Sequence, residues 1–441
     1  SGLLLMDFMA LKSIGIGGAL VVGLSLLVAL TLVPAMLGIL GSRINDWSVV
    51  PIRPEREGIW RVIAESVMRH PLLVSLPVVC LLVFLGSPFL RVQIGAPWAS
   101  ILPAHVESRR GWELLSHEYG IGEVDPILVV GVSHNPILGD PELIGSLYDY
   151  ISVLQADPKV SRVESIVNIG DGVSREGYQQ IYSLPEGDSP PEGMSGIQDL
   201  VRGNVTLFRV FEKSAPLSQE SKALVRSIRD SAPREHFKFY VTGSTADIMD
   251  VVDVMYRDFP KVIAFVVITI YLALFWLFRS VVLPLKAIIL NVMSIFASYG
   301  VLVYIFQEGH FEGLLGFTAQ GHIEASIPIL MFCLIFGLSM DYEVFLLSRV
   351  KEMYKTSKDN TRSVAFGLAR TGRVITSAAL VLALVAASFA TGDVVLVKAL
   401  GVGLAVAVLI DASIVRVLLV PALMRILGDW NWWMPKLFRS R

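Results

Sequence analysis

Long apolar segments separated by short polar links dominate the chain. A helix needs about 20 apolar residues to cross the hydrocarbon core of a bilayer. Seven segments reach or approach that length, and residues 1–8 look like the tail of an eighth. So many apolar runs in one chain are poorly explained as buried helices of a soluble protein, and they predict an α-helical polytopic membrane protein. The predicted spans are residues 16–40, 72–90, 259–278, 281–306, 325–347, 374–390 and 400–427.

One long segment, residues 91–258, has a different pattern. Short or alternating apolar runs predict strands, and apolar residues at helical spacing predict helices between them. Residues 170–196 are rich in Gly, Pro and Ser and predict a surface excursion. Strand, helix and strand in succession, twice over, predict an α+β domain of the ferredoxin-like type. The strands are predicted at residues 125–132, 160–167, 204–211 and 237–241, and the helices at 140–154, 218–229 and 245–255.

The distribution of charge supports this division and sets the orientation. Residues 91–258 hold 15 Lys and Arg against 24 Asp and Glu, whereas the rest of the chain holds 22 against 15. Lys and Arg concentrate in short cytoplasmic links of membrane proteins. The links 43–70 and 348–373 are therefore predicted to be cytoplasmic, and 91–258 extracytoplasmic. The basic residues on the cytoplasmic side include Arg43, Arg53, Arg56, Arg61, Arg69, Arg279, Lys286, Lys436, Arg439 and Arg441.

The predicted organisation results from these two patterns. It consists of residues 1–42 as the end of a first transmembrane repeat with its last span, 43–71 as a cytoplasmic linker, 72–90 as the first span of a second repeat, 91–258 as the extracytoplasmic domain, 259–428 as a five-span bundle, and 429–441 as a cytoplasmic C-terminal tail.

Composition excludes several other classes of protein. The chain is 54% apolar and only 17% charged, with a mean hydropathy of +0.62, which excludes a disordered chain, a disulfide scaffold and a typical cytosolic enzyme. No basic block indicates a nucleic-acid partner. The sequence contains no P-loop, HExxH or GxSxG motif, and its seven histidines lack the spacing of metal ligands. We therefore expect no enzymatic activity and no cofactor, and any active transport would draw on an ion gradient.

The two ends of the chain repeat one pattern. Lys12-Ser-Ile-Gly-Ile-Gly17 matches Lys398-Ala-Leu-Gly-Val-Gly403, and Val33-Pro-Ala35 matches Val420-Pro-Ala422. The offset is 386 residues for the first match and one more for the second, so one extra residue enters the second copy. A parallel repeat of six spans predicts a parent protein of about twelve spans, with roughly 300 or more residues before Ser1.

Ionisable residues inside a span are costly and mark functional sites by default. Asp341 and Glu343 interrupt the apolar run 325–347, and Tyr342 adds a hydroxyl beside them. Gly337 lies four residues before Asp341, so it shares that face of the helix and would let another helix approach closely. We interpret Asp341 as a proton-relay group, the alternative being a structural pair with a basic residue of a neighbouring helix. Glu343 lies on a different face, where a structural role is at least as favoured.

Two further charges, Asp411 and Arg416, lie in the last predicted span. Five residues of α-helix give about 140° of rotation, so we expect the two not to share a face and each to find a partner elsewhere. In the first copy of the repeat, the position that matches Asp411 is Ser25 or Leu24, and the position that matches Arg416 is Leu30 or Ala29. The first copy therefore has no charge at either position. A relay or gating role and a packing ion pair both remain open for them.

Three motifs of the sequence resemble those of MMPL transporters, within the resistance-nodulation-division (RND) superfamily. The first is Gly337-Leu-Ser-Met-Asp-Tyr-Glu-Val-Phe-Leu-Leu-Ser-Arg349, which is long and specific. The second runs from Gly401-Val-Gly403 through Asp411-Ala-Ser-Ile-Val-Arg416 to Pro421, and the third is Val241-Thr-Gly-Ser-Thr-Ala-Asp247. The resemblance covers the chain as the tail of the first half and the complete second half of such a transporter.

The resemblance implies a partial RND-type fold with a porter domain, and proton-driven export of lipids or other hydrophobic molecules across a bacterial plasma membrane. It assigns Asp341 and Tyr342 to an Asp-Tyr proton relay. Separately, we predict that Gly337, Gly401 and Gly403 are helix-packing glycines. The matching pair of the family would lie about 45 residues before Ser1, in the missing N-terminal half. An RND-like protein-export motor and a non-transporting lipid sensor or scaffold are the alternatives. Both a monomer and a homo-oligomer remain open.

Overall fold

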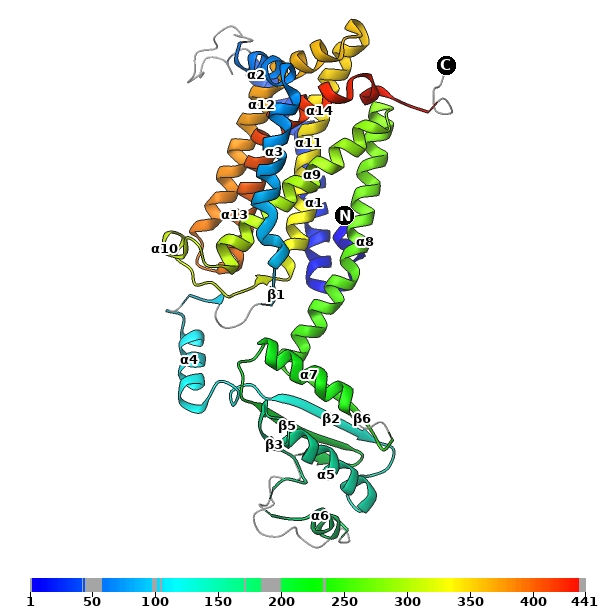
Figure 1. Ribbon diagram of the computed structural model, residues 1–441, viewed down its shortest axis with the longest axis vertical. Helices are drawn as coiled ribbons and strands as arrows, with labels where there is room; N and C mark the ends of the chain where they lie inside the picture. Colours follow the sequence, from blue (N-terminus) through cyan, green and yellow to red (C-terminus); the bar gives the residue numbers. More distant parts are fainter. Residues whose placement is uncertain are drawn as a thin grey trace. The chain divides into compact units, whose positions relative to one another are not determined.

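The computed structural model describes residues 2–41, 43, 58–96, 101–103, 105–169, 172–183, 200–232 and 235–435. Two compact units make up the chain, one of Ser1–Pro103 with Val254–Arg441, the other of Ala104–Asp253 (Figure 1). The basic residues Arg53, Arg56, Lys436, Arg439 and Arg441, on which the predicted orientation partly depends, lie outside the described residues.

The first unit is built from helices that are long and apolar enough to cross a membrane, seven of them within the described part of the chain. The predicted class, a multi-pass membrane protein, is confirmed. The seven are α1 (Met9–Leu40), α3 (Pro71–Gly86) with the 3-10 helix η3 (Ser87–Arg91), α8 (Ser244–Phe278), α9 (Val282–Leu302) with the π-helix η6 (Val303–Gln307), α11 (Ser326–Ser357), α12 (Asn360–Ser388) with the 3-10 helix η7 (Phe389–Thr391), and the last span, which joins α13 (Val395–Leu409), η8 (Ile410–Leu419), α14 (Val420–Leu427) and η9 (Gly428–Trp432).

Several helices extend well beyond the apolar runs that predict them. The predicted link 348–373 is wrong as a loop, because α11 continues to Ser357 and α12 begins at Asn360. Lys358 adopts a left-handed conformation (φ +53°), and the Asp359 carboxylate accepts a hydrogen bond from the Arg362 amide as an N-cap. Hydropathy locates only the part of a helix that lies in hydrocarbon, so the basic residues of this link lie on helix ends instead.

The segments predicted to face the cytoplasm lie together at one end of the first unit, where polar side chains connect them. There α2 (Gly58–Arg69) lies beside α12 (Figure 1). Asn360 donates to the Met424 carbonyl at 2.8 Å and accepts from the Trp432 indole at 3.2 Å. The Ser280 hydroxyl donates to the Asn431 carbonyl at 2.6 Å. Helix α2 and the links before α9, between α11 and α12, and after α14 therefore share this end.

The opposite end of the bundle holds the remaining short links. The strand β1 (Ile94–Gly95) pairs in parallel with β7 (Ile323–Glu324), so residues 94–95 belong to the membrane unit and not to the soluble domain predicted from residue 91. The buried Lys398 ammonium donates to the carbonyls of Leu315 and Gly316 at 2.5 and 3.1 Å, next to the short α10 (Glu312–Leu315).

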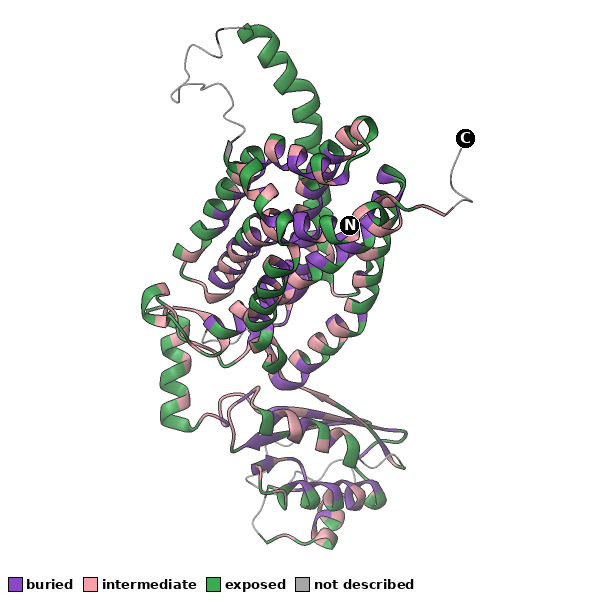
Figure 2. Ribbon diagram, turned by 45° about the horizontal axis from the view of Figure 1, so that its top comes forward, coloured by how far each residue is buried: buried purple, intermediate pink, exposed green. Residues whose placement is uncertain are grey.

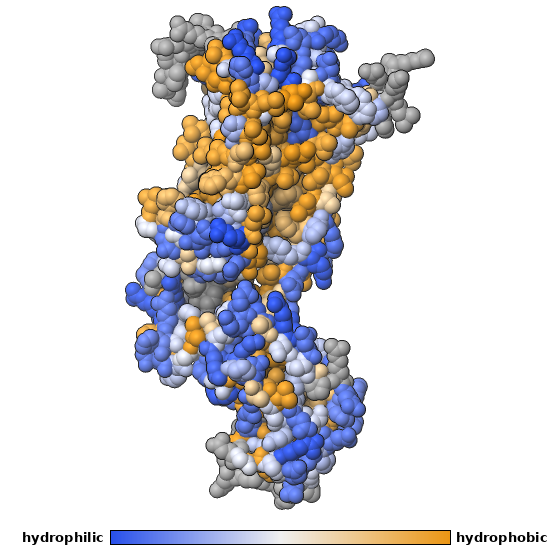
Figure 3. Space-filling view, in the orientation of Figure 1, coloured by the Kyte–Doolittle hydropathy of each residue, from blue (hydrophilic) through white to orange (hydrophobic). Residues whose placement is uncertain are grey.

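Burial differs sharply between the helices of this unit. More than half of the apolar stretches of α9, α11 and the last span is buried, whereas none of the apolar stretch of α1 is (Figure 2). Among the described residues, helix α1 is anchored near its start, where η1 (Gly2–Leu5) packs on it. The exposed surface of the helices is apolar along their middle and polar at the α2 end (Figure 3).

The second unit is an antiparallel sheet with helices in one hydrophobic core. Its strand order is β3-β5-β2-β6, with β4 added to β5. The Tyr150 hydroxyl of α5 donates to the Ile228 carbonyl of α7 at 2.9 Å, which joins the two helices. The elements are α4 (Glu107–Tyr119), β2 (Ile127–Ser133), α5 (Pro141–Gln155), β3 (Val160–Glu164), α6 (Arg175–Ile181), β4 (Val201–Arg202), β5 (Val205–Glu212), α7 (Gln219–Ser231), β6 (Phe237–Thr242) and the start of α8.

The predicted strands and helices of this unit are present, and two further helices were not predicted. Helix α4 is polar overall and none of its residues is buried, so it lacks the apolar residues that mark a core helix. Helix α6 lies inside the predicted surface excursion, where Tyr178 is fully buried against the core. The excursion is therefore partly core structure, and residues 170–171 and 184–196 of it lie outside the described residues.

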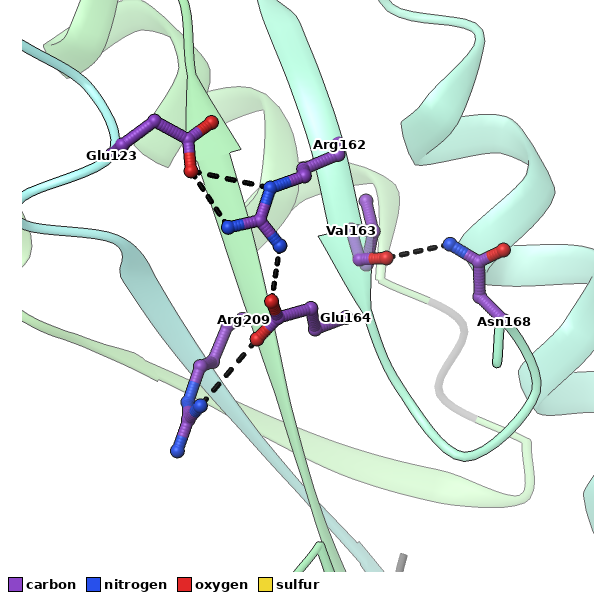
Figure 4. Close-up of polar contacts among 6 residues, drawn as sticks. All are labelled: Glu123, Arg162, Val163, Glu164, Asn168 and Arg209. Atoms are coloured by element: carbon purple, nitrogen blue, oxygen red, sulfur yellow. Dashed lines mark hydrogen bonds and ion pairs between the residues drawn. The ribbon is translucent and has the colours of Figure 1, made fainter. Parts of the chain in front are cut away.

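A surface network of ion pairs ties the outer strand β3 to its surroundings (Figure 4). Arg162 binds Glu123 at 2.6 Å and also pairs with Glu164 on its own strand. Glu164 in turn binds Arg209 of β5 at 3.4 Å. The guanidinium of Arg162 also lies 3.6 Å from the Phe211 ring centroid. Exposed pairs of this kind contribute about 0–1 kcal/mol each, so the network fixes the edge strand more than it stabilises the unit.

Candidate functional site

The candidate site is a group of charged side chains inside the membrane bundle. Glu343 of α11 and Lys286 of α9 lie 3.7 Å apart (Oε1 to Nζ), and each side chain is only 4–5% exposed. Glu343 is therefore paired inside the bundle. Lys286, predicted to belong to a basic cytoplasmic link, is a core residue of α9.

A second buried pair joins Asp411 and Arg416 within the last span. The Arg416 guanidinium donates from Nε and Nη2 to the Asp411 carboxylate (Oδ2) at 3.0 and 2.9 Å. The prediction that the two residues lie on different faces is wrong, because residues 410–419 form a π-helix and not an α-helix. In a π-helix hydrogen bonds run between residues five apart, so side chains five apart stack on one face.

The π-helix coincides with the extra residue of the second repeat. The offset between the copies changes from 386 to 387 between Gly403 and Val420, and residues 410–419 lie within that interval. A π-turn encloses one residue more than an α-turn, so it absorbs an inserted residue while the flanking helices keep their register. The corresponding part of α1 is α-helical throughout.

Helix α11 connects the pair in the last span to the motif around Asp341. The Ser339 hydroxyl donates to Asp411 Oδ2 at 2.9 Å, and Arg416 Nη2 donates to the Ser339 carbonyl. The Arg416 guanidinium also lies 5.1 Å from the centroid of the Tyr342 ring, within the range of a cation–π contact. Of the predicted site residues, the structure therefore brings together Tyr342, Asp411 and Arg416. Glu343 lies next to Tyr342 on α11.

Asp341 does not join this group. It lies on an exposed face of α11, and it makes no hydrogen bond or ion pair with any described residue. Gly337 lies on the same face, and a Cβ placed there meets no described atom within 4 Å. The expected close helix approach at Gly337 therefore does not occur within the described part of this chain, and the face around Asp341 is open.

The other two predicted packing glycines do lie at close helix contacts. A Cβ at Gly401 would lie 2.5 Å from Phe389 Cβ, and one at Gly403 would lie 2.7 Å from Met331 Sδ. Only a residue without a side chain fits these approaches of the last span to α12 and α11.

A polar stripe on α9 was not predicted. Asn291, Ser294 and Ser298 are all buried in the bundle, and their spacing of three and four residues places them along one face of α9. Within the described residues, Asn291 Nδ2, Ser294 Oγ, Lys286 Nζ and Glu343 Oε1 have no hydrogen-bond partner. Buried polar atoms of this kind are the positions where internal water binds. Polar residues every four or so positions in an otherwise apolar helix are the signal that would have identified the stripe.

The described residues contain no group of three or more His, Cys, Asp or Glu side chains that could hold a metal ion. The second unit (Ala104–Asp253), called the soluble unit below, does contain a buried acid, Glu212 of β5, which is 2% exposed. Burial raises the pKa of Glu212 to about 7, against the opposing effect of the hydroxyls of Ser221 and Ser214, which donate to it at 2.9 and 3.2 Å. This acid is part of the core of the soluble unit.

Comparison with known proteins agrees with this arrangement. A membrane protein of Streptomyces coelicolor is 32% identical to the chain over all of its residues, and the match covers 55% of that protein. The trehalose monomycolate exporter MmpL3 of Mycobacterium tuberculosis is 27% identical over 99% of the chain and 46% of its own length. The mycolic acid-containing lipids exporter MmpL11 of Mycolicibacterium smegmatis is 30% identical over 99% of the chain and 43% of its own length. The chain thus spans about half the length of these relatives.

The model of the MMPL family matches residues 1–74 and 207–441, which include all of the charged residues of the candidate site. This match confirms the resemblance drawn from the motif that begins at Gly337. The chain belongs to the MMPL family.

Proposed function

We propose that the chain is the second half of a proton-motive-force-driven exporter of lipids or other hydrophobic molecules. The single observation that carries the proposal is the group of buried charges between α9, α11 and the last span. A buried ion pair is a poor source of stability, because desolvation offsets most of the attraction between its charges. Charges retained inside a membrane bundle are instead typical of proton and ion pathways. The relatives named as lipid exporters favour lipid as the cargo class.

In this proposal Asp341 and Tyr342 carry the proton. Tyr342 lies between the open face of α11 and the Arg416 guanidinium, so a change in the charge of Asp341 would alter the field at Arg416. Asp411, Arg416 and Glu343 then act in the relay or in gating. Polar atoms of Lys286, Asn291 and Ser294 make no hydrogen bond with a described residue, and these are the groups that would hold water along the route.

The missing N-terminal half is the proposed partner of the open face. Asp341 and Gly337 lie on an uncovered face of α11, and the apolar stretch of α1 is bare. A first half of parallel topology would cover both surfaces. It would also enclose Asp341 away from lipid, as a proton-carrying acid requires. We propose a parent of about twelve spans.

We further propose that the soluble unit is a ferredoxin-like porter domain on an RND-type membrane fold. The strand order β3-β5-β2-β6, made from two strand–helix–strand units, supports this assignment. We propose that this unit is extracytoplasmic, that the end of the bundle with α2 faces the cytoplasm, and that the membrane is the bacterial plasma membrane. The excess of Lys and Arg in the links at that end supports the orientation.

The decisive experiment replaces Asp341 by Asn in the full-length protein and measures the appearance of lipid on the outer face of spheroplasts, with and without a protonophore. We expect wild-type export to depend on the proton gradient and D341N to abolish it. The matched control is D253N, which removes one exposed carboxylate of α8 that makes no hydrogen bond or ion pair with a described residue. We expect D253N to export normally.

Unchanged, gradient-dependent export by D341N, inserted at wild-type levels, would refute the relay. Export by neither the wild type nor the variants would favour the lipid sensor or scaffold. Gradient-dependent release of a polypeptide instead of lipid would favour the protein-export motor.

A further inference from the structure

A cavity of about 720 Å³ lies at the α2 end of the membrane unit, away from the intramembrane charges. Its walls come from α2, the end of α11, the start of α12, and α14. Four arginines line it, Arg61, Arg69, Arg362 and Arg425, and the apolar side chains of Met68 and Phe366 are also part of the lining. The volume is within the range of small-molecule sites, and the lining combines cations with apolar surface.

Two helices of the wall each present a row of lining residues to the cavity. Arg61 and Arg69 are eight residues apart on α2, and Arg362 and Phe366 are four apart on α12, so each set lies along one helix face. The amphipathic α2 is held against α12 because the Trp60 ring fits over Gly372, where a Cβ would lie 2.7 Å from Trp60 Cδ2.

Two acids also line the cavity, and each carboxylate already has a hydrogen-bond donor. Glu65 binds Arg61 at 2.9 Å, and Asp359 accepts from the Arg362 amide at 3.1 Å as the cap of α12. Arg425 donates to the neutral hydroxyl of Thr361 at 2.6 Å. Within the described residues, the guanidinium groups of Arg69 and Arg362 have no acidic partner. The cavity therefore carries a net positive charge with two guanidinium groups available for an anion.

We propose that this cavity binds the phosphate of an anionic phospholipid, with Arg69 and Arg362 on the headgroup and the glycerol and first acyl carbons on Met68 and Phe366. A guanidinium binds phosphate oxygens in bidentate fashion, which favours arginine over lysine at such a site. Basic pockets between membrane helices bind anionic headgroups in this way.

The surroundings of the cavity favour a lipid over a free phosphate compound. Ile59 and Val62 of α2 are 73% and 63% exposed, and α2 lies at the edge of the apolar surface of the bundle (Figure 3). Exposed apolar residues on an amphipathic helix at that level contact the boundary between headgroups and acyl chains. A lipid therefore reaches the cavity laterally, with its chains remaining in the bilayer.

The test is native mass spectrometry of the full chain in a non-ionic detergent, titrated with dioleoyl phosphatidylglycerol or with dioleoyl phosphatidylcholine. We expect the chain to retain phosphatidylglycerol and not phosphatidylcholine. The double variant R69Q/R362Q is expected to bind phosphatidylglycerol at least about tenfold more weakly, since charge-assisted hydrogen bonds to the phosphate are lost. The matched control R349Q/R373Q removes two exposed arginines of α11 and α12 that do not line the cavity, and we expect it to bind like the wild type.

Four outcomes would overturn the proposal. The first is equal binding of the two lipids, and the second is an equal loss in both double variants, which would indicate diffuse charge. The third is full retention of phosphatidylglycerol by R69Q/R362Q. The fourth is binding of inorganic phosphate or glycerophosphoglycerol as tightly as the lipid, which would identify a free phosphate compound as the occupant.

Thermal unfolding in the same detergent checks that the variants fold. Should R69Q/R362Q unfold, R69K/R362K keeps the charge but loses the planar fork of donors. We expect the lysine variant to bind phosphatidylglycerol more weakly than the wild type. Undiminished affinity in that variant would then reject the arginine site.

Discussion

Helix α1 and the last span are two copies of one sequence pattern in opposite surroundings. Each is preceded by a 3-10 turn, η1 or η7, that packs on the first glycine of the helix. A Cβ at Gly15 would lie 2.9 Å from Leu3 Cβ, and one at Gly401 would lie 2.5 Å from Phe389 Cβ. Leu3 and Phe389 are themselves 386 residues apart, so the repeat seen in the sequence is also a repeat in three dimensions. The pattern sets how each helix starts.

The two copies differ along the rest of the helix. The first is an unbroken α-helix without charges in its apolar stretch, and none of that stretch is buried. The second is largely buried, contains one residue more, and holds Asp411 and Arg416 in a π-helix. One inserted residue and two charges therefore distinguish a helix with a bare apolar surface from one that builds a polar core. Substitutions at matching positions of the two copies test this difference.

Removing one member of the buried pair should have the largest effect. In Arg416→Leu the Asp411 carboxylate remains buried with only the Ser339 hydroxyl as a donor. An uncompensated buried charge costs about 3–5 kcal/mol, and we expect that loss in the free energy of unfolding measured in detergent. The corresponding change in the first copy, Leu30→Ala, alters a residue that is 66% exposed and should have little effect.

The double variant D411L/R416M tests whether the instability of Arg416→Leu comes from the unpaired charge or from lost packing. Replacing both charges by apolar side chains should restore most of the lost stability, because the desolvation cost disappears together with the attraction. The first copy already has apolar residues at the position of Arg416. If the double variant were as unstable as Arg416→Leu, the pair would not act as an electrostatic unit.

The lysine that begins each copy gives the second prediction. Lys398 is buried and donates to the carbonyls of Leu315 and Gly316, whereas Lys12 is half-exposed and makes no hydrogen bond or ion pair with a described residue. Lys398→Met leaves those carbonyls without a charged donor and should cost about 1.5–3 kcal/mol. Hydrogen exchange should also become faster in α10. Lys12→Met is the control. Equal losses of unfolding free energy in both variants would show that the hydrogen bonds of Lys398 do not stabilise the chain.

The apolar pattern was sufficient to predict the spans and most of the soluble sheet, because burial in lipid or in a core requires apolar residues at fixed spacing. The arrangement of the candidate site could not be predicted in the same way. Asp411 and Arg416 were placed on different faces because the sequence was interpreted with α-helical geometry throughout, although the extra residue of the second copy indicated a local change. Lys286 was placed in a link because charge alone does not reveal a buried partner such as Glu343.

Deleting the extra residue gives the third prediction. Ser413 is exposed and lies between Asp411 and Arg416. Its deletion leaves the two charges four residues apart, the spacing at which α-helical side chains are neighbours, so the pair should persist in an α-helix. We expect a cost on the order of 1 kcal/mol, the net worth of about one hydrogen bond.

The control for this deletion is the removal of Ser377, an exposed residue of α12, which contains no π-helix. Every residue after that point would rotate by about 100° relative to the bundle, and the variant should not fold. Equal damage from the two deletions, measured by thermal unfolding, would show that the π-helix is not the site of an accommodated insertion.

The second glycine of each copy gives the smallest expected change in unfolding free energy. It is also the one prediction in which a substitution stabilises one copy and not the other. A Cβ at Gly17 meets no described atom within 4 Å, so Gly17→Ala should raise the stability of this chain by about 0.5–1 kcal/mol through helix propensity. At Gly403 the same change puts Cβ 2.7 Å from Met331 Sδ and 3.0 Å from Leu302 Cδ1, and the cost of moving these side chains should cancel or reverse the gain. In the full-length protein the proposed first half would cover α1. The gain at Gly17 should then disappear there, and a gain of equal size in both proteins would mean that nothing packs against that glycine.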